Sequence, residues 1–263
     1  MKSKIEKVGR LTISAVEELG YALMMFYESV YWLLFGKTHK QAVGLPLILA
    51  QVVQIGALAM PIVVVLCFSV GMMLSIQGLE TLKPYGAQSQ VVTGIALSVT
   101  REFSALITGI IVAGRSGSAI TARIGTMKES QEIDALQVIG INPVRYLAAP
   151  ALLAMIISMP ILTLFGDLMG MLGASVYTVY ELDMPIDIYM SRSFDVIAPF
   201  DLIQGLIKSV IFAVLIVVIS VINGFQVKGG AEGVGLATTR SVVMSISAIV
   251  IADMIFTFFL TRV

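Results

Sequence analysis

Four charged residues lie inside long apolar stretches of this 263-residue sequence: Arg101, Glu102, Lys208 and Asp253. A charged side chain at the centre of a lipid bilayer costs on the order of 3 kcal/mol, so each must be paired, solvated or functional if these stretches cross a membrane. Three roles are open. The charges can hold helices together as buried ion pairs, relay protons, or exchange partners during a conformational change. We take all four as candidate site residues.

Helix geometry limits how these charges can pair. Adjacent residues on an α-helix point about 100° apart, so Arg101 and Glu102 should reach different neighbours. Lys208 and Asp253 lie in two later apolar stretches. If those helices are antiparallel, the two residues can meet at one depth. The spacing therefore allows an Asp253–Lys208 pair or an Asp253–Arg101 pair.

Catalytic and metal chemistry find little support in the sequence. It has one cysteine, Cys67, and one histidine, His39, which excludes an intramolecular disulfide and argues against a Cys/His metal site. It shows no clustered nucleophile and base and no G-x-x-x-x-G-K-[ST] phosphate loop. We expect no catalytic residue, metal site or cofactor in this chain. If ATP drives the protein, another chain must bind the ATP and its Mg²⁺.

The composition is that of a membrane protein. Hydrophobic residues make up 57% of the chain, charged residues 13%, and the mean hydropathy is +0.95. A spanning helix needs about 20 mostly apolar residues. The formal net charge is zero, which does not suggest a nucleic-acid partner. We predict an all-α polytopic membrane protein, one domain over 1–263, with five transmembrane helices over 52–80, 91–113, 147–177, 202–222 and 241–261.

The first 40 residues differ from these spans. Glu17, Glu18 and Glu28 interrupt the apolar pattern of 1–40, which argues against a sixth span. We predict an amphipathic helix that lies along the membrane surface and ends at Gly36-Lys37, with no cleaved signal. Its interface-seeking rings would be Tyr21, Tyr27, Tyr31 and Trp32.

The distribution of Lys and Arg predicts the orientation. Six of them precede the first span and four lie between the second and third, against only Lys83 and Arg192 in the opposite loops. Because Lys and Arg favour cytoplasmic loops, the N-terminus should be cytoplasmic and the C-terminus on the opposite side. Arg262 is a basic residue that does not fit this pattern.

The cytoplasmic segment between the second and third spans contains a short helix signal. Thr126 and Glu129 have the spacing of a capping box, and Gly140-Ile-Asn-Pro143 is a helix stop. We predict an amphipathic helix over 126–140. It could lie on the lipid surface, but anionic lipids repel its acids, which favours a soluble protein partner. The predicted contact residues are Glu129, Glu132, Ile133, Asp134 and Leu136.

Several motifs together resemble the MlaE (YrbE) family of ABC transporter permeases. The main one runs from Gly114 through Met127 and continues to the helix stop at 140–143; Arg123 departs from it, since an acidic residue is common there. The likeness covers nearly the whole chain. Its other parts are Gln77-Gly78, Arg101-Glu102, Asn223-Gly224 and Ala237-Thr-Thr-Arg240.

The resemblance implies a function and partners. It implies an inner-membrane homodimer, with its C-terminus in the periplasm, that pairs with cytoplasmic ABC ATPase subunits and commonly with a small STAS-domain protein. A periplasmic hexamer of MCE-domain proteins would complete the assembly. Such systems move phospholipids between the membranes of diderm bacteria and maintain outer-membrane asymmetry. The helix over 126–140 would be the coupling helix that docks on the ATPase.

The resemblance also suggests where lipid would bind. Leu74, Gly78, Leu82 and Tyr85 recur at helical intervals and share one face, which the resemblance places in an outward-facing pocket at the dimer interface. Ordinary helix packing is the alternative. Small residues at Gly166, Gly170 and Ala174 predict a close helix contact.

Two other classes of function are weighed against a lipid permease. An ion-coupled secondary transporter would use Glu102 or Asp253 as the titrating group and would need no ATPase. Such carriers are commonly built from paired halves, which five spans do not provide. A membrane enzyme acting on lipids would need a nucleophile, base or metal cluster that the sequence lacks.

Overall fold

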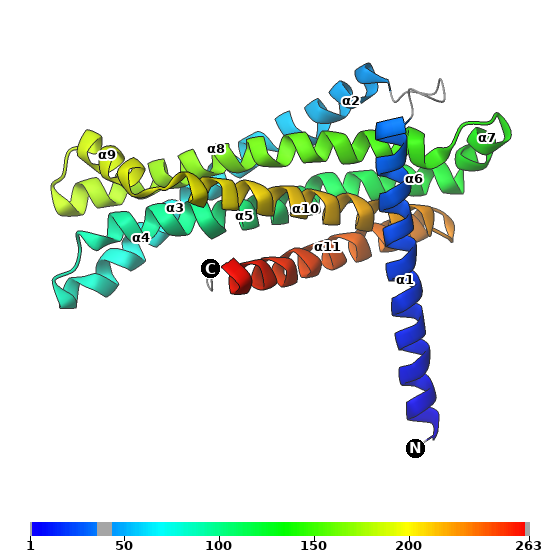
Figure 1. The fold of residues 1–263 in the computed structure, drawn as a ribbon, viewed down its shortest axis with the longest axis horizontal. Coiled ribbons are helices and arrows are strands. Elements are labelled where there is room, and N and C mark those ends of the chain that lie inside the picture. The colour runs from blue at the N-terminus through cyan, green and yellow to red at the C-terminus, as the bar shows by residue number, and fades with distance from the viewer. Residues whose placement is uncertain (1, 36–43, 261–263) are drawn as a thin grey trace.

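A computed structural model describes residues 2–35 and 44–260, so His39 and Arg262 lie outside the described residues, as does the predicted helix end at Gly36-Lys37. The described chain is helical, without strands. Five apolar helical segments are long enough to cross a membrane, and successive segments run in opposite directions (Figure 1). This confirms the predicted all-α polytopic membrane fold. The segments are Leu45–Tyr85, Gln90–Glu129, Val144–Leu182, Pro199–Phe225 and Gly230–Phe259.

The individual elements divide these segments as follows. Outside them lie α1 (Lys2–Phe35), α7 (Glu132–Val138) and α9 (Ile186–Val196). Within them lie α2 (Leu45–Val52), a π turn (Val53–Ala57), α3 (Met60–Leu82), a 3-10 turn (Lys83–Tyr85), α4 (Gln90–Ser98), a π turn (Val99–Phe103), α5 (Ser104–Val112), a π turn (Ala113–Gly117), α6 (Ser118–Glu129), a π turn (Val144–Ala148), α8 (Ala149–Leu182), α10 (Pro199–Phe225) and α11 (Gly230–Leu260).

The first segment bends before its proline. The helix is interrupted at Leu58 and Ala59, and Pro61 lies in the first turn of α3. A proline there removes no helical hydrogen bond, because the first amides of a helix have no partner within it. Pro61 lies in the middle of the uncharged stretch between Lys40 and Glu80, which predicts a tilted or kinked span over 52–80, whereas the long helix begins only at Met60.

The second segment continues far beyond its predicted end at residue 113. Residues 113–129 form a π turn and α6 rather than a loop. A polar residue of this stretch faces other helices: Thr121 Oγ1 lies 3.0 Å from the Ser220 carbonyl oxygen and 2.9 Å from Ser241 Oγ. Hydroxyls satisfied by neighbouring helices allow this polar stretch to stay helical.

The predicted capping box is wrong. Thr126 to Glu129 form the last turn of α6, and the next helix begins only at Glu132 after Gln131 adopts φ +61°. The Glu129 carboxylate accepts a hydrogen bond from the Gly230 amide at 2.9 Å, so it caps no helix of its own. The predicted stop is confirmed at Gly140, whose φ is +80°.

Small residues allow α3 and α8 to pack closely. A Cβ atom added at Gly71 would overlap the Gly170 carbonyl, and one added at Gly173 would overlap the Phe68 carbonyl. Gly166 likewise leaves no room for a Cβ beside Ser104. The close helix contact predicted from the small-residue stripe is therefore confirmed.

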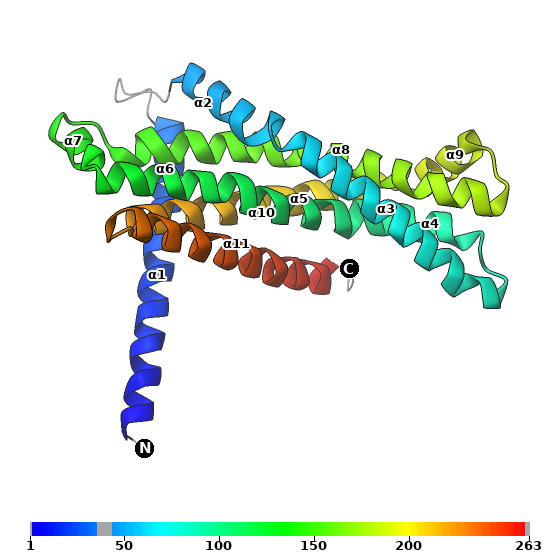
Figure 2. The ribbon, with the colours of Figure 1, turned by 180° about the vertical axis from the view of Figure 1, so that it is seen from behind.

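The two ends of the bundle differ. Figures 1 and 2 show α7 and the α10–α11 turn at one end, called here the α7 end, and α9 with the α3–α4 turn at the other, the α9 end. Helix α1 crosses the bundle axis at the α7 end. Asn142 Nδ2 donates to Glu28 Oε1 at 2.7 Å, and Arg145 lies over the Trp32 ring at 5.8 Å. If the bundle spans the bilayer, α1 runs along its surface.

The α3–α8 contact yields a stability test. We expect Gly71→Ala to lower the free energy of unfolding by about 1–3 kcal/mol, because the added methyl must push apart the backbones of α3 and α8. The measurement is thermal unfolding of the purified protein in detergent. Gly235→Ala in α11 is the control, since nothing lies within 4 Å of its added Cβ. Equal melting temperatures for the two variants would contradict this account of the contact.

Candidate functional site

Lys208 on α10 is the centre of a buried charge cluster. Its side chain is 0% exposed, and its ammonium donates to Glu102 Oε2 and, at 2.9 Å, to Thr257 Oγ1. Asp253 Oδ1 lies 3.0 Å from the same nitrogen, within ion-pair distance but without hydrogen-bond alignment. Glu102 lies in the π turn over 99–103, whereas Asp253 and Thr257 lie on α11. One ammonium therefore ties three parts of the bundle together.

A second ion pair lies beside the first. Arg101 Nε donates to Asp201 Oδ1 at 2.7 Å, and the Asp201 side chain is almost fully buried. The other oxygen, Asp201 Oδ2, accepts from the Ala198 amide at 2.9 Å and so caps α10. Adjacent Arg101 and Glu102 thus reach different partners, as predicted.

The pairing prediction is confirmed for one alternative. Lys208 pairs with Asp253, whereas Arg101 pairs with Asp201 and not with Asp253. Sequence reasoning missed Asp201, because this residue lies just before the predicted span over 202–222. It also missed Thr257, because a threonine in an apolar helix gives no distinctive signal.

This arrangement can hold neighbouring helices together through ion pairs. One ammonium faces two carboxylates, so Lys208 can keep a partner while either acid moves. The described residues contain no group of three or more His, Cys, Asp or Glu side chains able to hold a metal ion. With one ammonium and two carboxylates, the cluster offers charge exchange or proton binding.

A largely apolar groove lies between α3 and α4 at the α9 end. Its volume is about 340 Å³, and it brings together three of the four residues predicted to contact lipid, Leu74, Gly78 and Leu82. The groove is open to the outside along Gly94 of α4. The rest of its lining is Gln77, Thr81, Gln90, Val91, Ile95 and Ser98.

Tyr85 does not belong to this groove. It is 80% exposed and lies in the 3-10 turn that follows α3. Helical spacing keeps side chains on one face only while the helix continues, and α3 ends at Leu82. The prediction that all four residues share one face is therefore corrected to three.

The short helix α7 presents a different face from the predicted one. Ile133 is 2% exposed and packs into the core of this chain, so its predicted contact with a partner is wrong. Leu136 is half-buried, Glu132 is exposed, and Asp134 pairs with Lys128 at 3.1 Å. The exposed apolar residues are Val138 and Ile139, at 87% and 68%. The sequence missed them because it does not show which face of this helix packs against the rest of the chain; the observed helix also begins six residues later than predicted.

The buried cluster yields a test of non-additivity. Glu102→Gln or Asp253→Asn alone leaves one carboxylate beside Lys208, whereas the double variant leaves a buried cation with neutral partners only. Breaking a buried pair in this way costs about 3–5 kcal/mol. We expect the double variant to lose far more folded protein than the sum of the single variants, measured by fluorescence-detected size exclusion and melting temperature.

The control for this cycle is Lys83→Gln. It removes the exposed Lys83–Glu181 pair of 3.2 Å and should leave the melting temperature unchanged. Strictly additive effects of the two acid substitutions would show that the acids do not share Lys208.

Comparison with known proteins agrees with this architecture. A family model described as Permease MlaE matches residues 48–259. The chain is 34% identical over 250 residues to a probable ABC transporter permease protein of Rickettsia prowazekii, covering 95% of both chains. It is 31% identical over 254 residues to the intermembrane phospholipid transport system permease protein MlaE of Haemophilus influenzae, covering 96% of this chain and 95% of that protein.

A relative from a plant is also similar. The chloroplastic protein TRIGALACTOSYLDIACYLGLYCEROL 1 of Arabidopsis thaliana is 38% identical over 190 residues, which cover 72% of this chain and 54% of that protein. The family match spans all five apolar segments, from α2 into the end of α11. The chain therefore belongs to the MlaE family of ABC transporter permeases.

Proposed function

We propose that this permease moves phospholipids between a membrane and a protein acceptor, using ATP hydrolysed by a separate subunit. The observation that carries the proposal is the groove between α3 and α4, whose exposed surface is mostly apolar and which lies between helices at the α9 end. An apolar groove suits an acyl chain, because an acyl chain binds by burying apolar surface and needs no polar ligand. The name of the Haemophilus relative, a phospholipid transport permease, supports the same substrate class.

The open side of the groove supports a homodimer. Gly94 and Gln77 leave one side of the groove uncovered, and α3 exposes apolar side chains such as Val65 and Met73. A second copy packed against this side would enclose a lipid between two grooves. We therefore propose a homodimer with the lipid path at its interface.

The α7 end is the proposed docking site for the ATPase. Helix α7 exposes Val138 and Ile139, which are apolar, beside the exposed acids Glu132 and Asp134. Carboxylates disfavour contact with anionic lipid, whereas exposed apolar side chains favour burial in a protein interface. Asn142, which follows α7, donates to Glu28 of α1 and accepts from the Val144 amide at 2.8 Å. Movement of α7 would therefore be transmitted to α1 and, through the π turn over 144–148, to α8.

The remaining partners and the location rest on the family resemblance and the charge distribution. We propose the inner membrane of a diderm bacterium, with the N-terminus cytoplasmic and the C-terminus periplasmic. The α7 end would then face the cytoplasm, where a STAS-domain protein would join the ATPase. The α9 end would face a periplasmic MCE-domain hexamer, and the assembly would serve outer-membrane lipid homeostasis.

The charge cluster is proposed to take part in the transport cycle. Lys208 joins α10 to α11 and to the π turn that directly follows α4, one wall of the groove. Exchange of its partners would couple helix movement to the groove. The rival is an ion-coupled carrier in which Glu102 or Asp253 titrates. That rival predicts transport without an ATPase.

The docking proposal predicts loss of the ATPase on changing the exposed face of α7. Val138→Asp with Ile139→Asp should abolish co-purification of an ATPase subunit from native membranes in mild detergent, because two charges would enter an apolar contact. Tyr180→Asp is the control, since Tyr180 is equally exposed but lies at the α9 end. A variant that keeps the ATPase would refute docking at α7. A wild-type protein that purifies alone and transports without nucleotide would favour the ion-coupled carrier.

The groove proposal predicts that filling the groove stops transport. Gly94→Phe should abolish ATP-dependent transfer of a fluorescent phospholipid from proteoliposomes containing the full complex, while ATPase binding persists. Gly235→Phe is the matched control, because both glycines are helical, exposed and free of neighbours within 4 Å. Unchanged transfer by the Gly94 variant would show that lipid does not use this groove.

A further inference from the structure

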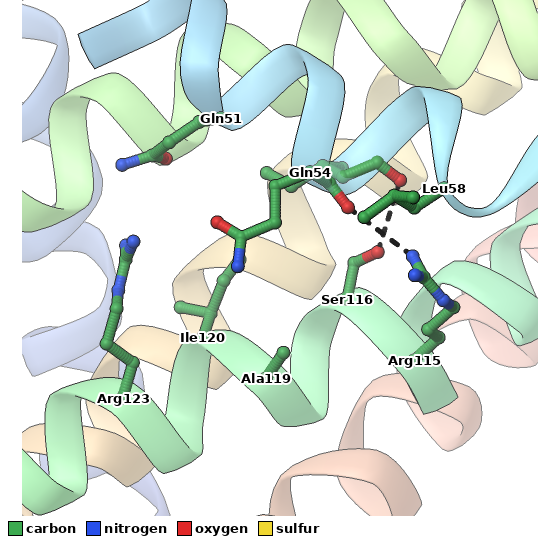
Figure 3. Close-up of a pocket in the computed structure, with 9 residues that line it drawn as sticks. Gln51, Gln54, Leu58, Arg115, Ser116, Ala119, Ile120 and Arg123 are labelled. Carbon is green, nitrogen blue, oxygen red and sulfur yellow. Dashed lines mark hydrogen bonds between the residues drawn. The ribbon is translucent and has the colours of Figure 1, made fainter.

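A second cavity, of about 210 Å³, lies in the half of the bundle near the α7 end. It separates α2 and the π turn over 53–57 from the π turn over 113–117 and α6. In Figure 3 the Arg123 side chain extends from α6 toward the Gln51 amide, and the Gln54 side chain lies to one side of this pair. The lining residues are Gln51, Gln54, Ile55, Leu58, Arg115, Ser116, Ala119, Ile120 and Arg123.

The polar groups of this cavity are left incompletely paired. Arg123 Nε is buried without a hydrogen-bond partner, and so is Gln51 Oε1. Arg115 makes one long hydrogen bond, from Nη1 to the Gln54 carbonyl at 3.4 Å. Within residues 2–35 and 44–260, no carboxylate pairs with either guanidinium. Buried polar groups are normally satisfied, so this cavity is built for a ligand that brings negative charge.

The depth of the cavity matches the edge of the hydrocarbon layer. Phe212, the middle residue of α10, lies beside Gly109 and marks the centre of the bundle. Counted from Gly109, Arg115 and Arg123 lie six and fourteen residues further along the chain. At the rise of an α-helix this is about 9 and 21 Å. The hydrocarbon core extends about 15 Å from its centre. The two arginines therefore straddle the level at which lipid phosphates begin.

The cavity wall is apolar near Arg115, the arginine that lies closer to the membrane centre. Leu58 is 55% exposed there, and Ile55, Ala119 and Ile120 continue the aliphatic surface. A free phosphate ion would use the arginines and leave this wall unused. An amphipathic anion would occupy both parts.

We propose that this cavity binds the headgroup of a phospholipid from the leaflet at the α7 end. The guanidinium groups of Arg123 and of Arg115, which lies nearer the membrane centre, would donate to the phosphodiester oxygens. Gln51 Oε1 would accept from a headgroup hydroxyl or ammonium, and Leu58 would contact the first part of an acyl chain. This site lies in the opposite half of the bundle from the α3–α4 groove and does not depend on lipid being transported through that groove.

The test is photolabelling of the full-length protein, with any bound partners, in detergent micelles. The probes are phosphatidylglycerol with a diazirine near the top of one acyl chain and diacylglycerol with the same diazirine. Mass spectrometry would locate the labelled peptides. We expect phosphatidylglycerol to label residues 53–58 or 115–123, and Arg123→Gln to reduce this labelling about tenfold, as expected for loss of a charge-assisted hydrogen bond.

Matched controls separate this site from general charge and from the groove. Lys228→Gln removes an exposed cation at the same end and should leave labelling unchanged. Gly94→Phe should remove label only from the α3–α4 groove, so failure at one site does not imply failure at the other. Equal labelling by diacylglycerol, or no effect of Arg123→Gln and Arg115→Gln, would overturn the proposal. Displacement of the label by inorganic phosphate would instead assign the cavity to a free anion.

Discussion

The burial of Lys208 is the constraint on which the arrangement of the bundle depends. A fully buried ammonium is tolerated only when its charge is met nearby, and its three partners come from the second segment and from α11. This requirement fixes the facing sides of three helices at one depth. The Arg101–Asp201 pair repeats the link between the second segment and α10 nearer the α9 end. Apolar packing alone would let these helices slide, because lipid and side chain are equally apolar.

The contact between α3 and α8 supplies a second kind of constraint. Gly71, Gly170 and Gly173 bring the two backbones together without side chains between them. The charge cluster fixes register through electrostatics, whereas this contact fixes it through shape. Together they hold the first and third segments on one side of the bundle and the fourth and fifth on the other.

Three of the π turns lie beside polar sites. The turn over 99–103 carries Arg101 and Glu102, while the turns over 53–57 and 113–117 face each other across the cavity lined by Arg115. A π turn widens the helix locally and redirects the side chains that follow it, which is why such turns are frequent at functional sites. In this permease they allow apolar spanning helices to present charged groups inward without ending.

The sequence by itself determined the class of the protein, because runs of about 20 apolar residues have few stable places outside a bilayer. It also determined that Lys208 must be paired, solvated or functional, since an unpaired buried charge is too costly. Only the tertiary structure decided which acid meets which base, because those partners are 45 to 106 residues apart and the sequence of one helix face does not show which helix packs against it. The same dependence on tertiary structure explains why the predictions for α6, Ile133 and Tyr85 were wrong. Thr121 remains helical because Ser220 and Ser241 satisfy its hydroxyl, and Ile133 is buried because it packs into the core formed by other segments of the chain. Local patterns set where a helix can form, but where it ends and which face it exposes depend on contacts made by distant parts of the chain.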